Sequence, residues 1–209
     1  SSRTISLIHD HGSEITNTFI TTLYNLEIAR VGSATITIEI DNKTYKTFSA
    51  GAAVNAGGGL VKLPIASGHG FLAGERVCID GTVNYDGVFV INSVEETYII
   101  IPATYVAESI PADAVVRVVI RNVGSFMSNM NPITITAKDY VASGHQKQRV
   151  VFYNDLSYAR PYFAGLLRES YIRGIKFYTE SSIGIQIDAC LSLFVEYCSV
   201  TGNASYDAL

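Results

Sequence analysis

The chain has 209 residues, 48% of them hydrophobic, which is enough for one large domain or two small ones with a packed core. A net charge of −4, with no cluster of lysine or arginine, argues against a nucleic acid partner because phosphate binding needs a basic footprint. No apolar run approaches the roughly 18 residues of a membrane span, so no membrane partner is expected, and the wealth of Thr, Ile, Val and Tyr predicts a mostly β fold.

The first predicted element is an edge or arm strand over Arg3–His11, in which Ile5, Leu7 and His9 share one side. The next segment, Glu14–Ile28, is ambiguous. Its apolar residues recur at helical spacing, while its β-branched content favours a strand. Both interpretations stay open at this point. The residues at helical spacing are Ile15, Phe19, Leu23 and Leu26.

A hairpin and a flexible joint are predicted next. Ala34–Ile40 alternates cleanly and is followed, after Asp41-Asn42-Lys43, by the second predicted strand, Thr44–Phe48. Ser49–Gly59 is small, polar and rich in glycine, which is typical of a flexible connection. The sequence therefore predicts an N-terminal β unit (arm plus hairpin) over residues 1–50 and a linker over 51–59.

A meander of short strands is predicted from Leu60 to Ile101. The expected strands are Leu60–Ile65, Arg76–Ile79, Val88–Val94 and Tyr98–Ile101. The turns between them carry glycine or paired polar residues, and Asp86-Gly87 supplies the positive φ that a sharp reversal needs. Short strands joined by tight turns are typical of a small β-barrel or sandwich.

The order of motifs in this stretch resembles a small β-barrel module of bacteriophage tail, fibre and other virion proteins. The motifs are Ser-Gly-His-Gly-Phe, Gly-Glu-Arg-Val, Ile-Asp-Gly-Thr and Asn-Tyr-Asp-Gly-Val-Phe-Val-Ile-Asn-Ser-Val, then Thr-Tyr-Ile-Ile-Ile. They cover about a fifth of the chain. The resemblance implies a spacer or docking module and brings no enzymatic residues.

Ala114–Ile120 is a nearly continuous apolar strand that is expected to complete this module over residues 60–122. Residues 123–209 form the predicted C-terminal β region. Strands are expected there at Ile133–Ala137 and Arg149–Tyr153, and Ser157–Ser170 carries a short helical pattern broken by proline and glycine.

The last third, at about residues 172–203, alternates short apolar pairs with short polar steps. The paired inward positions are Ile175/Phe177, Ile185/Ile187, Leu193/Val195 and Cys198/Val200. This rhythm favours a β-solenoid. It resembles the start of a right-handed parallel β-helix, the body of many phage tailspikes and of pectate-lyase-like enzymes. Because a solenoid needs several stacked coils, either the remainder lies beyond Leu209 or this segment is a lone flat set of hairpins. The first residue is Ser rather than Met, and Leu209 follows a strand pattern that has not closed, so the chain is expected to be processed or a fragment.

Histidine clusters are weak site candidates. His9-Asp10-His11 could start a metal site, but no third ligand is identifiable nearby, so no metal and no cofactor is predicted. His69 lies between two glycines, where a ring that bonds to the backbone is the favoured explanation.

Carboxylates of the solenoid-like segment are the other candidates, because paired carboxylates cleave glycans. Glu180, Asp188 and Glu196 are spaced by eight residues, which could align them on successive coils. Solvated positions on the outside of the coils are the favoured interpretation, so no catalytic residue is assigned. Whether the protein is an enzyme stays open, with a non-enzymatic role favoured for this chain.

The cysteines and the glycosylation sequons indicate no further functional site. Cys78, Cys190 and Cys198 are an odd number without a Cys-x-x-Cys pair, which indicates buried thiols, and the last two share the eight-residue spacing and are expected to stack in the core. Asn42 and Asn203 begin chance-level sequons.

Together these patterns predict a structural protein of a bacteriophage virion, located in the phage tail as the attachment region of a tail fibre or tailspike involved in host adsorption. Expected partners are other virion tail proteins, further copies in a trimer, and a host surface glycan. Exposed β edges and the apolar residues Phe163, Leu166 and Leu167 motivate the trimer. The alternatives are the N-terminal part of a carbohydrate-active β-helix enzyme, such as a host polysaccharide depolymerase, and a bacterial surface adhesin module.

Overall fold

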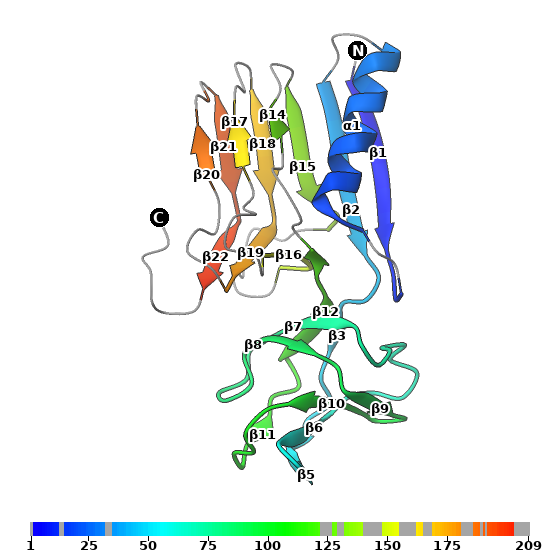
Figure 1. Ribbon diagram of the computed structural model, residues 1–209, viewed down its shortest axis with the longest axis vertical. Helices are drawn as coiled ribbons and strands as arrows, with labels where there is room; N and C mark the ends of the chain where they lie inside the picture. The colour runs from blue at the N-terminus through cyan, green and yellow to red at the C-terminus, as the bar shows by residue number, and fades with distance from the viewer. Residues whose placement is uncertain are drawn as a thin grey trace. The chain divides into compact units, whose positions relative to one another are not determined.

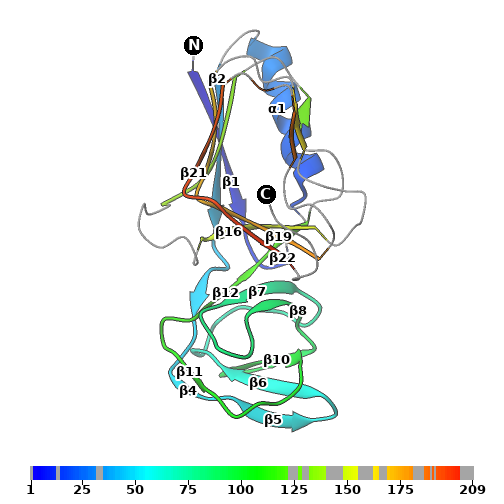
Figure 2. The same ribbon diagram turned by 90° about the vertical axis from the view of Figure 1, so that its left-hand side faces the viewer.

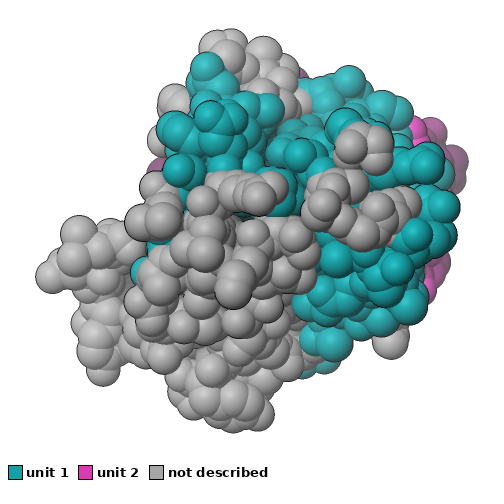
Figure 3. Space-filling view, turned by 90° about the horizontal axis from the view of Figure 1, so that it is seen from above, with its two compact units in different colours: residues 1–9, 14–42, 120–209 teal, residues 10–13, 43–119 magenta. Residues whose placement is uncertain are grey.

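A computed structural model describes most of the chain. The described residues are 2–12, 15–31, 35–121, 127–128, 132–139, 148–154, 162–164, 169–180, 186–188, 190 and 192–202. They form a mostly β structure with one helix among them. The chain divides into two compact units, coloured separately in Figure 3. Unit 1 comprises residues 1–9, 14–42 and 120–209, and unit 2 comprises residues 10–13 and 43–119.

Unit 1 contains a 5-stranded sheet in which all neighbouring strands are parallel (Figure 1). Its strands, in spatial order, are β1 (Ser2–His9), β2 (Thr35–Asn42), β15 (Ile133–Ala137), β18 (Ser170–Arg173) and β21 (Leu193–Glu196). Parallel neighbours need long crossover connections, and here helix α1 (Asn17–Val31) joins the first two.

Two further parallel sheets complete unit 1. One contains β13 (Ile120–Arg121), β16 (Val150–Asn154), β19 (Ile175–Thr179) and β22 (Ser199–Gly202), and the other contains β14 (Met127–Ser128), β17 (Tyr162–Ala164) and β20 (Gln186–Asp188). From β15 to β22 the chain visits the three sheets in rotation, and Figure 2 shows strands of each sheet overlying one another.

The core of unit 1 is built by alternation along each strand. Ile38, Ile135 and Ile172 occupy one register row and are almost completely buried, so each covers the next. Ile20 and Tyr24 of α1 pack into the same core. The segment that the sequence left ambiguous between helix and strand forms α1. Thr16 caps this helix, because its hydroxyl oxygen accepts the Phe19 N–H at 3.2 Å.

Unit 2 has its own apolar core and two 4-stranded sheets. One contains β5 (Val54–Gly57), β6 (Leu60–Pro64), β10 (Tyr98–Pro102) and β9 (Ser93–Glu95); the other contains β3 (Lys46–Thr47), β12 (Val115–Val118), β7 (Arg76–Asp80) and β8 (Gly87–Val90). β11 (Ser109–Ile110) pairs with β4 (Gly51–Ala52). The predicted meander is present, although the strand expected at Val88–Val94 is split into β8 and β9.

The predicted linker over residues 51–59 is wrong. These residues form β4 and β5, and the Ala53 N–H donates to the Glu108 carbonyl oxygen at 2.9 Å. Packing is tight at Gly51, since a Cβ there would lie 3.3 Å from the Pro64 side chain. The three glycines from Gly57 have positive φ and make the turn into β6.

The predicted hairpin of Ala34–Ile40 with Thr44–Phe48 is also wrong. β2 pairs in parallel with β1 and β15, whereas β3 pairs with β12 in unit 2. The domain limits differ accordingly, because residues predicted as one N-terminal unit are shared between the two units. The strand predicted at Ala114–Ile120 is divided in the same way: β12 belongs to unit 2 and β13 to unit 1.

The remaining expected strands, at Ile133–Ala137 and Arg149–Tyr153, correspond to β15 and β16. The short helical pattern of Ser157–Ser170 lies largely outside the described residues. Three of its positions form β17 instead.

Candidate functional site

The histidine segment near the N-terminus is structural. His9 is buried in unit 1, whereas His11 belongs to unit 2, where its Nδ1 lies 3.1 Å from a Glu75 carboxylate oxygen. That carboxylate also accepts the N–H groups of Gly12 (2.8 Å) and Leu72 (2.9 Å). Glu75 therefore ties residues 10–13 to unit 2. Among the described residues no cluster of His, Cys, Asp and Glu could hold a metal ion.

His69 uses both ring nitrogens on the backbone. Its Nδ1 accepts the Phe71 N–H at 3.0 Å, which leaves Nε2 to donate to the Glu95 carbonyl oxygen at 3.0 Å. The side chain is buried and stacks on Phe71. This geometry fits the backbone-bonding role favoured from the sequence.

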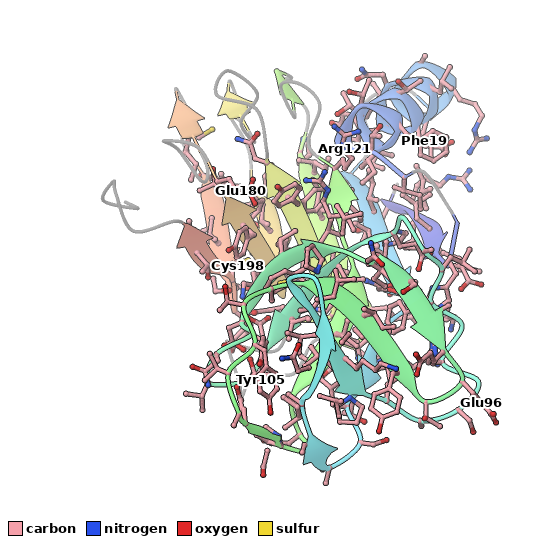
Figure 4. All side chains as sticks on the ribbon, turned by 60° about the horizontal axis from the view of Figure 1, so that its bottom comes forward. Phe19, Glu96, Tyr105, Arg121, Glu180 and Cys198 are labelled. Atoms are coloured by element: carbon pink, nitrogen blue, oxygen red, sulfur yellow. The ribbon has the colours of Figure 1, made fainter. Side chains whose placement is uncertain are left out.

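The carboxylates predicted to align on successive coils do not do so. Glu180 follows β19, Asp188 ends β20 and Glu196 ends β21, which lie in three different sheets. Arg173 and its register partner Glu196 are 23 residues apart, so a spacing of eight moves to another sheet rather than to the neighbouring strand of the same sheet. Figure 4 labels Glu180 on this part of unit 1.

Four side chains of β18 and β21 come together on the outward face of the 5-stranded sheet. The rings of Tyr171 and Phe194 stack with centroids 5.1 Å apart and planes at 18°. The Arg173 guanidinium carbon lies 4.0 Å from the Tyr171 centroid, and its Nε donates to a Glu196 carboxylate oxygen at 2.6 Å. Phe194 is 45% exposed, so one aromatic surface faces solvent.

The four side chains of this cluster lie at one end of two rows of register partners, and each row crosses all five strands of the sheet. The rows are Thr4, Thr37, Thr134, Tyr171 and Phe194, and Ser6, Glu39, Thr136, Arg173 and Glu196. We call this surface the Tyr171 face. Its signal in the sequence is the repeated polar-apolar-polar triplet, as in Thr134-Ile135-Thr136 and Tyr171-Ile172-Arg173. The triplet alone does not say which strands are neighbours.

Two ion pairs lie on the Tyr171 face and beside it. Lys138 Nζ lies 3.0 Å from an Asp41 carboxylate oxygen, and this hydrogen bond raises the Lys138 pKa. Arg173 is paired with Glu196 in the same way. The surface therefore presents hydroxyl groups, a ring face and paired charges, which suits a neutral polyhydroxyl ligand better than an ionic one.

The cysteines and the first sequon are also structural. Cys190 and Cys198 both pack against the unit 1 core, and burial raises the pKa of the Cys198 thiol. Cys78 is buried in unit 2. Asn42 is buried and its side-chain amide donates to the Arg149 carbonyl oxygen at 2.8 Å, so it is no accessible glycan acceptor. Asn203 lies outside the described residues.

Comparison with known proteins finds no match. No protein-family model, no curated protein and no solved structure corresponds to this chain. Within the described part of the chain, no helix is both long and apolar enough to cross a membrane.

Proposed function

We propose that the chain is a structural component of a bacteriophage virion, namely the attachment region of a tail fibre or tailspike. In this proposal unit 1 is the opening part of a right-handed parallel β-helix and unit 2 is a small β-barrel module inserted into it. The observation that carries the proposal is the repeated register, in which Ile38, Ile135 and Ile172 fall in one row on three parallel strands. Such rows suit an elongated shaft that grows coil by coil.

Stacked rows continue on the second sheet, and in this proposal they give the shaft rigidity. Phe152 and Phe177 are register partners in the second sheet, and their rings stack with centroids 5.9 Å apart. Side chains that repeat at one position bury one another regardless of length, so each added coil contributes a similar stabilisation. A stiff, extensible body of this kind fits the mechanical role of a fibre.

Assembly into a trimer is part of the proposal. On the outer side of α1, Phe19 is 46% exposed and Leu26 is 62% exposed, whereas Ile20 and Tyr24 of the same helix are completely buried. Apolar surface of this kind favours association, and cyclic symmetry lets each copy cover the same patch on its neighbour. The side chains of Phe163, Leu166 and Leu167, which motivated the trimer, lie outside the described residues.

Light scattering of the purified chain tests the assembly. We expect a trimer that persists on dilution, and we expect Leu26→Asp to shift it toward monomer, since a buried unpaired charge opposes association. Val54→Asp, at an exposed valine of unit 2, is the matched control and should leave the mass unchanged. A monomer at all concentrations would contradict the structural proposal.

A second candidate is host glycan recognition, either as part of a depolymerase or as an adhesin. The Tyr171 face favours it, because stacked rings beside hydroxyl and paired charged groups can hold a sugar chain. A glycan-release assay with host polysaccharide separates cleavage from binding. Binding without release that is lost in Phe194→Ala would support an adhesin, and release of oligosaccharides would support the enzyme.

A further inference from the structure

Two adjoining loops of unit 2 expose apolar side chains. Val83, in the loop between β7 and β8, is 82% exposed, and Tyr105 and Val106, between β10 and β11, are 39% and 43% exposed. Figure 4 labels Tyr105 on this part of unit 2. We call Val83, Tyr105 and Val106 the apolar tip. Exposed valine and tyrosine side chains on two loops lose hydrophobic stabilisation that a buried position would provide.

Hydrogen bonds fix the two loops to each other. The Glu108 carboxylate accepts the N–H groups of Val83 (2.6 Å) and Asn84 (2.9 Å), and also the Asn84 side-chain amide at 3.0 Å. The Tyr85 hydroxyl donates to the Val106 carbonyl oxygen at 2.6 Å and accepts the Val106 N–H at 2.9 Å. The apolar side chains are therefore held outward by an ordered backbone, and little conformational entropy would be lost when a partner binds.

The two loops of the apolar tip are acidic. Residues 81–86 and 103–108 contain no Lys, Arg or His, whereas they contain the carboxylates Asp86 and Glu108. A surface with this charge repels nucleic acid and anionic lipid and attracts a basic surface.

We propose that the apolar tip is a docking site for another protein, one that presents an apolar pocket rimmed by lysine or arginine. Tyr105 and the two valines would enter the pocket, and the Asp86 and Glu108 carboxylates would face the basic rim. Interfaces commonly have this arrangement of an apolar centre with a polar rim. The inference concerns unit 2 alone and does not depend on the phage assignment.

Two synthetic peptides test the proposal on the full chain. One has a leucine centre flanked by lysines, and the other has glutamates in place of the lysines. By fluorescence anisotropy we expect the basic peptide to bind about tenfold or more tightly than the acidic one, and the difference to shrink at high salt. Hydrogen exchange with the basic peptide bound should slow amides of the two tip loops, residues 81–86 and 103–108.

Variants locate the effect. Val83→Ser and Tyr105→Ser should each lower the affinity for the basic peptide by about tenfold. Val54→Ser, at another exposed valine of unit 2, should leave this affinity unchanged. Because Val83 is so exposed, its replacement leaves folding intact, which a thermal melt checks. Equal binding of both peptides, protection elsewhere, or unchanged affinity in Val83→Ser would each overturn the proposal.

Discussion

At the scale of single residues, the reversal between β7 and β8 depends on a backbone conformation that glycine adopts readily. Asp86-Gly87 was predicted to reverse the chain, and Gly87 has a φ of 145°, a region open almost only to glycine. The Asp86 side chain supports the turn by accepting the Thr82 N–H at 2.7 Å. His69 likewise has the backbone-bonding role that its two flanking glycines indicated.

Replacing Gly87 by valine should destabilise unit 2 by about 1 to 3 kcal/mol, because a β-branched residue is strained at this φ. A thermal or urea melt measures the change. Val83→Ala, in the preceding loop, is the control, and its stability in the melt should stay close to that of the parent protein. An unchanged melt for Gly87→Val would mean that the turn can relax to another conformation.

Tyr24 gives a pH prediction. Burial raises its pKa from 10.0 to about 12. The folded state thus holds the phenol proton more tightly than the unfolded state, so this contribution to stability is complete below pH 10 and is lost as the pH rises toward 12. We expect the free energy of unfolding to fall by up to about 1.4 kcal/mol per pH unit there. Urea unfolding at several alkaline pH values measures it, and Tyr24→Phe should remove this part of the decline.

At the scale of elements, a glycine-rich composition did not mean a flexible joint. The stretch predicted as a joint contains β4 and β5, and its three consecutive glycines form the turn into β6, where a positive φ favours glycine. The Ala114–Ile120 segment was predicted as one strand that completes the module, but this buried apolar run supplies strands to two units. Periodicity reports burial and not the partner strand.

Hydrogen exchange distinguishes the strands from a linker. The Ala53 amide, bonded to the Glu108 carbonyl oxygen, should exchange at least about tenfold more slowly than the amide of Gly58 at the turn, because exchange requires the bond to open. Equally fast exchange at both amides would restore the linker interpretation.

At the scale of the molecule, unit 2 is held together by its own core, and residues 10–13 join it through Glu75. A fragment of residues 43–119 should therefore fold by itself but melt below the full chain's unit 2, since Glu75 loses its contacts with His11 and Gly12. Circular dichroism during heating tests this. In the full chain, Glu75→Gln should lower the melting temperature of unit 2. If the fragment of residues 43–119 is unfolded, the folding of unit 2 depends on unit 1.

By itself the sequence determined the mostly β class, the turns of the central meander and the buried faces of strands such as β15 and β16, because glycine conformation and period-2 burial are local properties. The tertiary structure decided which strands pair. An alternating strand such as β2 satisfies its backbone equally well in a hairpin or in a parallel sheet, and only burial of Ile36, Ile38 and Ile40 against the distant β1, β15 and α1 selects the parallel one. The Tyr171 face exists for the same reason, since Tyr171 and Phe194 become neighbours only through that long-range register.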